Sequence, residues 1–413
     1  MKDKLNIGLI SYRSNPYCGG QGVYIRNLSR ELSNLGHNVE VIAGPPDPLL
    51  NNGVKLTMLE CLDLYNPEAL FRTPSIKELM DPINLYEWLS VSTMGYPEPF
   101  TFGLRAYRYL RKRKDKFDII HDNQCLSYGM LAIKKHFPTI ATIHHPISID
   151  RQIALDSVRS WWKKLKHRRW YSFIGMQKKV SRKLDKIITV SESSKNDICN
   201  DFQTGSDNFE VVPNGIDTDI FYPKNDIEKD PDRIIVTNSA DTALKGLYYL
   251  LKALKIIEQK RKIKLTVIGT PKKNGGIEKL VKELNIGHLI DFTGRIDDER
   301  FVNEYAKASI AVVPSVYEGF GLPVGEAMAC GIPVITTDGG ALAEVAGDAA
   351  VVVPTKSPEK LSEAIIKLLD DKEEMERLGK AGYERVMENF TWKKAAERTV
   401  EVYRKVIDDY SRL

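Results

Sequence analysis

The chain has 413 residues, of which 42% are hydrophobic and 28% are charged, and its formal net charge is +5. This composition is ordinary for a soluble globular protein, and the length exceeds what one core usually serves, so we expect two domains of roughly 200 residues each. No stretch of about 18 apolar residues is present to span a membrane. The N-terminus lacks the apolar core of a signal peptide, which predicts a protein that stays in the cytoplasm.

The cysteines are odd in number, are scattered along the chain and contain no C-x-x-C pair. They are Cys18, Cys61, Cys125, Cys199 and Cys330. This distribution argues against a disulfide framework and against a zinc site. We therefore expect reduced thiols in packed positions.

The first half of the chain alternates strand-like apolar runs with helical patterns. A first strand at 5–11 leads through the glycine loop CGGQG into a helix at 23–36, and a second strand follows at 37–44. The segment from about 44 to 100 is rich in Pro and aromatic residues and shows no long regular pattern. It either shapes a binding pocket or is a structural excursion. Further strands are predicted at 117–122, 138–145 and 185–193.

The second half repeats this alternation. Strands are predicted at 232–239, 264–269, 290–295, 308–315, 333–337 and 349–354. Alternating strands and helices indicate parallel α/β units, so two Rossmann-like domains are the simplest interpretation. Pro, Asn, Gly and Asp interrupt the periodicity at 211–223, which predicts domains at 1–213 and 214–392. The tail from Ser357 to Leu413 has helical apolar spacing throughout.

The stretch EGFGLPVGEAMACG, residues 318–331, contains two carboxylates eight positions apart around a glycine turn. An apolar run precedes it and another follows, which predicts strand, glycine loop, short helix and strand. Gly319 and Gly321 permit a positive φ and a close approach of the backbone to a ligand. Pro323 suits the first turn of a helix, whose free N–H groups attract phosphate.

Each carboxylate has a chemical use at this position. Glu318 enters the loop and can accept hydrogen bonds from sugar hydroxyls, and Glu326, expected in the first helical turn, can accept both hydroxyls of a ribose. The spacing therefore suits a nucleotide-sugar. The alternative is that Glu326 complements the helix dipole and that Glu318 is a solvated loop residue.

The whole string closely resembles the E-x7-E signature of retaining GT-B glycosyltransferases of family GT4. The resemblance implies a GT-B fold, with two Rossmann-like domains facing across a cleft and the last helix, 393–413, packed back on the first domain. It also implies a donor site that includes Gly319, Phe320, Gly321 and Leu322. The donor would be a nucleotide-sugar such as a UDP-sugar or a GDP-sugar, with no cofactor and no metal.

Other motifs extend the resemblance to nearly the whole chain outside 45–100. The glycines of the first loop, Gly19, Gly20 and Gly22, match the family's glycine loop at the cleft, although a turn that needs glycine for its shape alone has the same pattern. His144 stands at the family's T-x-H position, at the end of a predicted strand, where ligands of open α/β sheets collect. The resemblance makes His144 a contact of the donor sugar or the acceptor. We include His145, the next residue, among the candidate acceptor contacts.

Lys245, in ALKG before a helix, matches the family lysine that binds the leaving diphosphate. The alternative is a surface lysine. An Arg commonly precedes that lysine by five or six positions in the family, whereas this chain has Ala240 and Ser239 there. The charge at the leaving group must then come from Lys245, the loop amides and Arg295.

The resemblance implies transfer of a hexosyl group with retention of configuration to a saccharide or lipid-linked acceptor. Glu318, Lys245 and His144 would be the catalytic group, and Glu326 would hold the ribose. Two other classes stay open. One is a GT-B-like epimerase or phosphorylase, and the other is a nucleotide-binding Rossmann protein without catalysis.

The segment 159–183 contains ten Lys or Arg and no Asp or Glu, interleaved with Trp, Tyr and Phe. Basic and aromatic residues on a helix favour an anionic membrane surface, which places the protein at the inner face of the cell membrane. Nucleic acid would produce a similar footprint, but no nucleic-acid-binding module accompanies it, so we expect no nucleic-acid partner. A solvated helix with its aromatic residues in the core is the alternative.

Overall fold

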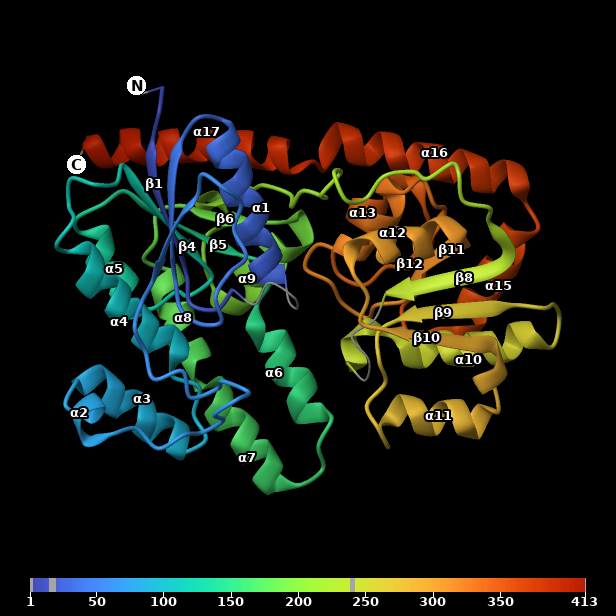
Figure 1. Cartoon of the computed structure of the whole chain (residues 1–413), viewed down its shortest axis with the longest axis horizontal. Coiled ribbons are helices and arrows are strands. Elements are labelled where there is room, and N and C mark those ends of the chain that lie inside the picture. Colours follow the sequence, from blue (N-terminus) through green and yellow to red (C-terminus); the bar gives the residue numbers. More distant parts are fainter. Residues whose placement is uncertain (1–2, 15–19, 238–241, 413) are drawn as a thin grey trace. The chain divides into compact units, whose positions relative to one another are not determined.

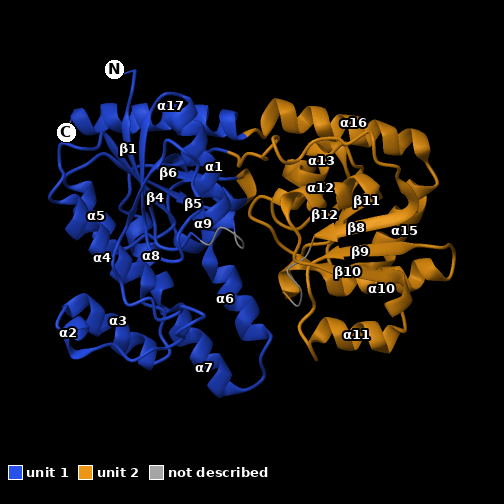
Figure 2. Cartoon of the chain, in the orientation of Figure 1, with its two compact units in different colours: residues 1–190, 194–212, 392–413 blue, residues 191–193, 213–391 orange. Residues whose placement is uncertain are grey.

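Two parallel β-sheets organise the chain, which confirms the prediction of α/β architecture (Figure 1). The computed structural model describes residues 3–14, 20–237 and 242–412. Unit 1 comprises residues 1–190, 194–212 and 392–413, and unit 2 comprises residues 191–193 and 213–391 (Figure 2).

The sheet of unit 1 has the order β3-β2-β1-β4-β5-β6-β7, and every neighbouring pair is parallel. Its strands are β1 (Asn6–Ser11), β2 (Asn38–Ala43), β3 (Lys55–Met58), β4 (Ile119–Asn123), β5 (Thr139–Ile143), β6 (Ile187–Thr189) and β7 (Phe209–Val211). The central strands β4 and β5 are buried along their whole length, which is typical of a parallel sheet covered on both faces.

The helices of the first part of the chain and the last helix belong to unit 1, apart from Glu192 and Ser193. They are α1 (Gly20–Asn34), α2 (Ile76–Leu79), α3 (Pro82–Ser92), α4 (Glu98–Leu110), α5 (Tyr128–Lys134), α6 (Ile147–Asp156), α7 (Trp161–Trp170), α8 (Ile174–Ser181), α9 (Glu192–Phe202) and α17 (Trp392–Ser411), with 3-10 turns η1 (Tyr171–Phe173) and η2 (Ser206–Asn208). Helix α17 is amphipathic and buries Trp392 and Tyr403 in the same core cluster as Leu28 of α1.

The sheet of unit 2 has the order β10-β9-β8-β11-β12-β13 and is also parallel. Its strands are β8 (Asp230–Thr237), β9 (Lys264–Ile268), β10 (Ile290–Gly294), β11 (Ala308–Val313), β12 (Val334–Thr337) and β13 (Val351–Val353). The helices are α10 (Leu247–Glu258), α11 (Gly276–Leu284), α12 (Asp298–Lys307), α13 (Leu322–Ala329), α14 (Leu342–Ala346), α15 (Pro358–Leu369) and α16 (Lys372–Asn389), with 3-10 turns η3 (Ala243–Lys245), η4 (Gly287–Leu289) and η5 (Gly347–Ala349).

The segment 44–100 is more regular than the sequence pattern predicts. It contains strand β3, helices α2 and α3 and the start of α4. A capping box at Ser75 and Glu78 starts α2, and Asp81 caps α3, with its carboxylate accepting from the Ile83 amide. These caps lie in a short, Pro-rich stretch in which apolar periodicity is weak, so periodicity alone does not reveal the helices.

No helix in the described part of the chain is both long enough and apolar enough to cross a membrane. The cysteines in the described part of the chain carry free thiols. They are Cys61, Cys125, Cys199 and Cys330. Cys125 and Cys330 are buried, and burial raises the pKa of the Cys330 thiol to about 12. Such thiols are packing residues with little nucleophilic character.

Candidate active site

Glu318 lies in the loop between β11 and α13 of unit 2. Gly340 closes against this loop at φ +66, and an added Cβ there would lie 2.3 Å from the Glu318 carbonyl oxygen. The Ala341 amide donates to that carbonyl oxygen at 2.9 Å. The loop after β12 therefore holds the backbone of Glu318, and the close approach requires glycine at position 340.

Lys245 ends the turn η3, directly before helix α10. Gly246 follows at φ +69, where an added Cβ would lie 1.8 Å from the Pro314 carbonyl oxygen. The Val316 amide donates to the Leu244 carbonyl at 2.7 Å. These backbone contacts join the loop before α10 to the loop after β11, which is why two distant stretches of sequence meet at one place.

The Lys245 ammonium and the Glu318 carboxylate form an ion pair, in which Nζ donates to Oε1 at 2.7 Å. The Ser315 hydroxyl donates to the same oxygen at 2.8 Å. The side chains of Lys245 and Glu318 are 30% and 14% exposed, so the pair is accessible from the surface of unit 2. The structure thus brings together two of the residues that the sequence hypothesis assigned to catalysis.

The glycine turn continues from Glu318 into helix α13. Gly321 is the N-cap residue at φ +103, and it has no side chain to satisfy the first N–H groups of the helix. Gly319 lies in the loop before it, and Leu322 begins the helix. Phe320 is buried with its ring edge-on to Phe390, at a centroid distance of 5.6 Å, so it anchors the turn in the core.

Glu326 lies in the second turn of α13, not in the first as the sequence pattern predicted, because the helix begins at Leu322. Burial raises the pKa of the Glu326 carboxyl to about 7. The Lys245 ammonium opposes this shift, and the carboxylates of Glu318 and Asp298 add to it. Lys245, Glu318 and Glu326 therefore form one electrostatic cluster.

Arg295 directly follows strand β10, at the carboxyl edge of the same parallel sheet as Glu318. Strands β9 and β8 separate β10 from β11. Ser239 and Ala240, which stand where the family has an Arg, lie outside the described residues. Lys245 is a cation that the structure places next to the glycine turn, through its ion pair with Glu318.

His144 directly follows strand β5 in unit 1. Its Nε2–H donates to Asn123 Oδ1 at 2.8 Å, and its backbone amide donates to Gln124 Oε1 at 2.8 Å. The Tyr24 ring meets the imidazole edge-on, with centroids 4.7 Å apart. Since an amide oxygen only accepts, Nε2 carries the proton and Nδ1 carries the lone pair.

Burial lowers the pKa of His144 to about 3, and His145 and His121 lower it further. The ring is therefore neutral at neutral pH and suits hydrogen bonding to a hydroxyl more than proton donation. His145 pairs with Asp150 through Nε2 at 2.7 Å, and its carbonyl accepts from the Gln124 side chain at 3.1 Å. Both histidines thus belong to one polar group in unit 1.

The sequence pattern did not reveal the residues that hold His144 in place. Asn123 ends β4, the strand next to β5, and Gln124 directly follows it. Buried His121, on the same strand, hydrogen bonds to Tyr403 of α17 and to Thr142 of β5, each at 2.6 Å. A signal was present, because the polar run His-Asp-Asn-Gln stands directly after an apolar strand pattern.

The glycines of the first loop differ in part from the prediction. Helix α1 begins at Gly20, so Gly20 and Gly22 lie in its first turn, three residues before the predicted helix start. Gly22 is buried. Gly19 lies outside the described residues. The first turn of α1 therefore occupies positions that we expected in the glycine loop.

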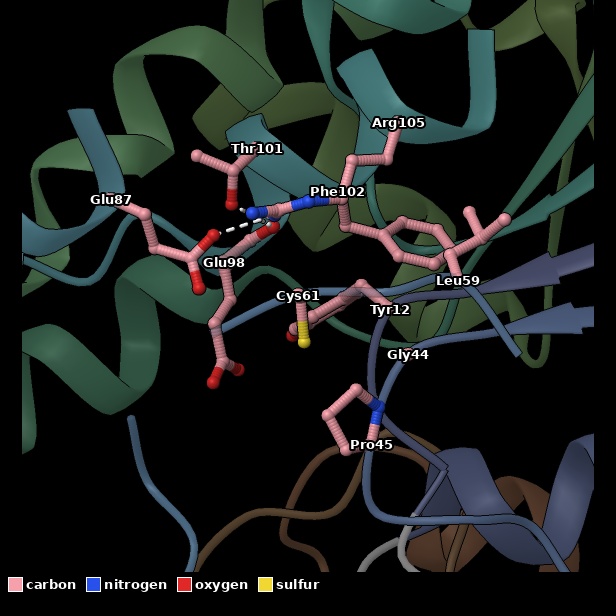
Figure 3. Close-up of a pocket in the computed structure, with 10 residues that line it drawn as sticks. All are labelled: Tyr12, Gly44, Pro45, Leu59, Cys61, Glu87, Glu98, Thr101, Phe102 and Arg105. Atoms are coloured by element: carbon pink, nitrogen blue, oxygen red, sulfur yellow. Dashed lines mark hydrogen bonds and ion pairs between the residues drawn. The ribbon is translucent and has the colours of Figure 1, made fainter. Parts of the chain in front are cut away.

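A small cavity lies at the ends of β1 and β2 in unit 1 (Figure 3). Its volume is about 20 Å³, which is the size of one water molecule and too small for a sugar. Arg105 and Glu87 form a buried ion pair across it at 2.5 Å. Glu98 also lines the cavity, and it accepts from Arg13 at 3.0 Å and from the Tyr96 hydroxyl at 2.7 Å. This cluster fixes α3 and α4 to the sheet.

Comparison with known proteins decides the family. The profile of the family described as Glycosyl transferases group 1 matches residues 217–385, and that of Glycosyltransferase Family 4 matches residues 18–220. An MMP alpha-(1->4)-mannosyltransferase of Mycolicibacterium hassiacum is 44% identical over 408 residues, which are 98% of each chain. The chain belongs to the GT4 family of glycosyltransferases. It is accordingly a transferase that uses a sugar donor.

Further matches agree with this family. A D-inositol 3-phosphate glycosyltransferase of Catenulispora acidiphila is 26% identical, over 98% of this chain and 96% of its own. A sucrose-phosphate synthase structure from Thermosynechococcus elongatus has a TM-score of 0.75 at 24% identity, covering 99% of this chain and 100% of that one. The structure of Anabaena HepE in complex with UDP-glucose has a TM-score of 0.68 at 13% identity, covering 97% and 100%. The fold is GT-B, as predicted.

Proposed function

We propose that this GT4 enzyme transfers a hexosyl group from a nucleotide-diphosphate sugar to a saccharide or lipid-linked acceptor, with retention and without a metal ion. The observation that supports this proposal most directly is the Lys245–Glu318 pair beside the glycine turn that opens α13. A cation, a carboxylate and a free helix end are the groups that a sugar diphosphate requires.

The donor diphosphate binds at the start of α13 in this proposal. The amides near Gly321 and Leu322 donate hydrogen bonds to the phosphate oxygens, because the first N–H groups of a helix have no acceptor within it. The Lys245 ammonium moves from Glu318 to the diphosphate as negative charge develops there. Stabilisation of that charge by fixed groups supplies most of the rate enhancement, and no metal ion is required for it.

The two carboxylates hold the rest of the donor. Glu318, relieved of Lys245, accepts hydrogen bonds from the hydroxyls of the transferred sugar. Glu326 accepts from the ribose hydroxyls one helical turn into α13. The raised pKa of Glu326 fits this role, since a carboxyl that is desolvated in the free enzyme gains two hydrogen-bond donors when the nucleotide binds.

The transferred sugar is mannose in this proposal, because the similar enzyme of M. hassiacum is described as an alpha-(1->4)-mannosyltransferase. His144 of unit 1 contacts a hydroxyl of the sugar donor or the acceptor through the lone pair of Nδ1. Asn123 and Gln124 fix the orientation of that ring. Loss of the His144 contact to the sugar, or of the contacts that orient the His144 ring, is expected to reduce turnover while the fold remains.

The proposal includes peripheral association with an anionic membrane surface through 159–183. Helix α7 has no buried residue, and Trp161, Trp162 and Leu165 are 65%, 55% and 44% exposed. Lys163 and Arg168 lie exposed on the same helix. Interfacial helices combine exposed aromatic and basic side chains in this way.

The test is a transfer assay with GDP-mannose, UDP-glucose and other sugar nucleotides, with saccharide acceptors, and with NMR assignment of the product anomer. We expect an α-linked product from an α-linked donor and an initial rate that EDTA does not change. Glu318→Gln, which keeps the shape of the side chain, should lower turnover strongly. A requirement for inorganic phosphate or release of free sugar without an acceptor would contradict the proposal, as would rescue by a divalent ion after EDTA.

A further inference from the structure

A second, much larger cavity lies in unit 1, between the 65–95 segment and helix α7 with its following turn. Its volume is about 520 Å³, within the range of small-molecule sites. The walls are chiefly aromatic and aliphatic, and they include Tyr65, Phe71, Val91, Met94, Trp170 and Tyr171. None of these residues belongs to the transfer site described above.

The aromatic side chains of the wall pack against one another. Trp170 stacks on Tyr96 at a centroid distance of 4.8 Å and meets Tyr65 edge-on at 5.6 Å. The Tyr65 hydroxyl is already committed, because it donates to the Gly95 carbonyl at 3.1 Å. The wall therefore offers ring faces and edges to a ligand and few hydrogen bonds, which favours an alkyl chain over a sugar.

Two wall residues have an unusual backbone conformation. Phe71 and Met94 have φ values of +56° and +61°, in a region that residues with a bulky side chain rarely occupy. Met94 follows the C-cap residue of α3 in a Schellman motif, since its amide donates to the Val91 carbonyl and the Gly95 amide donates to the Ser90 carbonyl. Glycine usually stands at that position of the motif. Strain of this kind is concentrated at ligand sites.

The side chains of these two residues also leave apolar surface exposed to water. Phe71 is 58% exposed and Met94 is 44% exposed, although they line a cavity that a ligand would fill. A chain that fills the cavity would cover this surface, and covering apolar surface is favourable. A ligand in the cavity would thus explain both the positive φ values and the exposed apolar surface of Phe71 and Met94.

Basic side chains lie at the cavity. Lys166 of α7 lines it, and Arg169 of the same helix donates to Thr93, at the end of α3, at 3.1 Å. Helix α7 has basic residues in its last turn and no acidic residue in its first. An anionic head group is complementary to this rim.

We propose that this cavity binds the aliphatic chain of a monomeric anionic amphiphile, with the head group at Lys166. The site is independent of the proposed sugar transfer, because it is formed entirely by the 65–95 segment, α7 and η1. Its occupant can be identified by binding alone, without any transfer assay.

The experiment is isothermal titration calorimetry with alkyl phosphates below their critical micelle concentrations. We expect saturable 1:1 binding of decyl phosphate, and a Kd that falls about threefold to fourfold for each methylene added from octyl to decyl. Decyltrimethylammonium, which has the same chain and a cationic head, should bind at least tenfold more weakly. Lys166→Gln should remove most of that preference and leave the chain-length dependence unchanged.

The decisive variant is Phe71→Asn with Met94→Gly, because Asn and Gly both tolerate a positive φ. We expect at least a tenfold weaker binding of decyl phosphate and a melting temperature that does not fall. Met80→Gln is the matched control, since Met80 is 78% exposed and lies outside the cavity lining. It should bind as the wild type does.

Three results would overturn the inference. One is the absence of saturable binding by any alkyl phosphate, and another is undiminished binding by the Phe71→Asn, Met94→Gly variant. The third is binding to anionic vesicles without any binding of the monomeric amphiphile, which would make this face a membrane contact.

Discussion

Lys245 Nζ donates a hydrogen bond of 2.7 Å to Glu318 Oε1, across 73 positions of sequence. Each side chain neutralises the charge of the other in this pair. A sugar diphosphate competes with Glu318 for the ammonium, and the sugar hydroxyls compete with Lys245 for the carboxylate. Donor binding in the proposed mechanism therefore replaces one ion pair with two ligand contacts, so that little charge pairing is lost.

Lys245→Ala should lower kcat by roughly 10²-fold to 10³-fold, because a fixed charge at the leaving group acts mainly in the transition state. The Kd of the donor should change by much less, and calorimetry measures it separately from turnover. Lys255→Ala is the matched control, since Lys255 pairs with Glu258 at 3.0 Å on α10 of the same unit. A loss of kcat below about threefold in Lys245→Ala would show that another group supplies the charge.

Glu326→Gln should change how stability depends on pH. The pKa of Glu326 is raised to about 7 in the folded protein, so the folded state holds the proton more tightly than the unfolded state does. Its stabilising contribution is complete below about pH 4.5 and is lost as pH rises through 7, an effect of roughly 1–3 kcal/mol. Denaturant unfolding from pH 4.5 to 8 should therefore give a steeper decline for wild type. Parallel curves for the two proteins would contradict this assignment.

His144→Ala should lower kcat/KM without changing the shape of its pH profile between 5 and 8. The reason is that the pKa of His144 is about 3, so the ring does not titrate in that window. Asn123→Ala should reproduce part of the loss, since Asn123 Oδ1 accepts from the ring at 2.8 Å. If the profile of wild type contains an inflection near pH 6.5 that His144→Ala removes, His144 is protonated in the working enzyme and its proposed role is wrong.

Charge reversal on α7 tests the membrane part of the proposal. Lys163→Glu, Lys164→Glu and Arg168→Glu together should abolish sedimentation with anionic vesicles and leave nucleotide binding intact. Arg169 is left in place because it hydrogen bonds to Thr93 and Ser172. Wild-type association should weaken with salt, since exposed charges are screened over about 8 Å near physiological ionic strength. Equal binding to neutral and anionic vesicles would leave α7 as an ordinary solvated helix.

The sequence by itself determined the α/β class and the strands at the centre of each sheet. Central parallel strands are buried on both faces, so they appear as continuous apolar runs such as those of β4 and β11. The GT4 family was also recognisable, because the spacing of Glu318 and Glu326 around a glycine turn is a local property of the chain. The edge strands β3 and β7 were missed, since a short edge strand is buried on fewer sides and leaves a weaker pattern.

Only the tertiary structure decided which side chains meet. The ion pair of Lys245 with Glu318 depends on Gly246 packing against Pro314, a contact between two loops that no sequence period encodes. The neutral state of His144 depends on burial beneath residues from β4, and the raised pKa of Glu326 depends on burial and on charges from three separate segments. Local patterns fix the secondary structure, whereas burial, charge state and the cavity beside α7 arise from long-range packing, so these last properties required the folded chain.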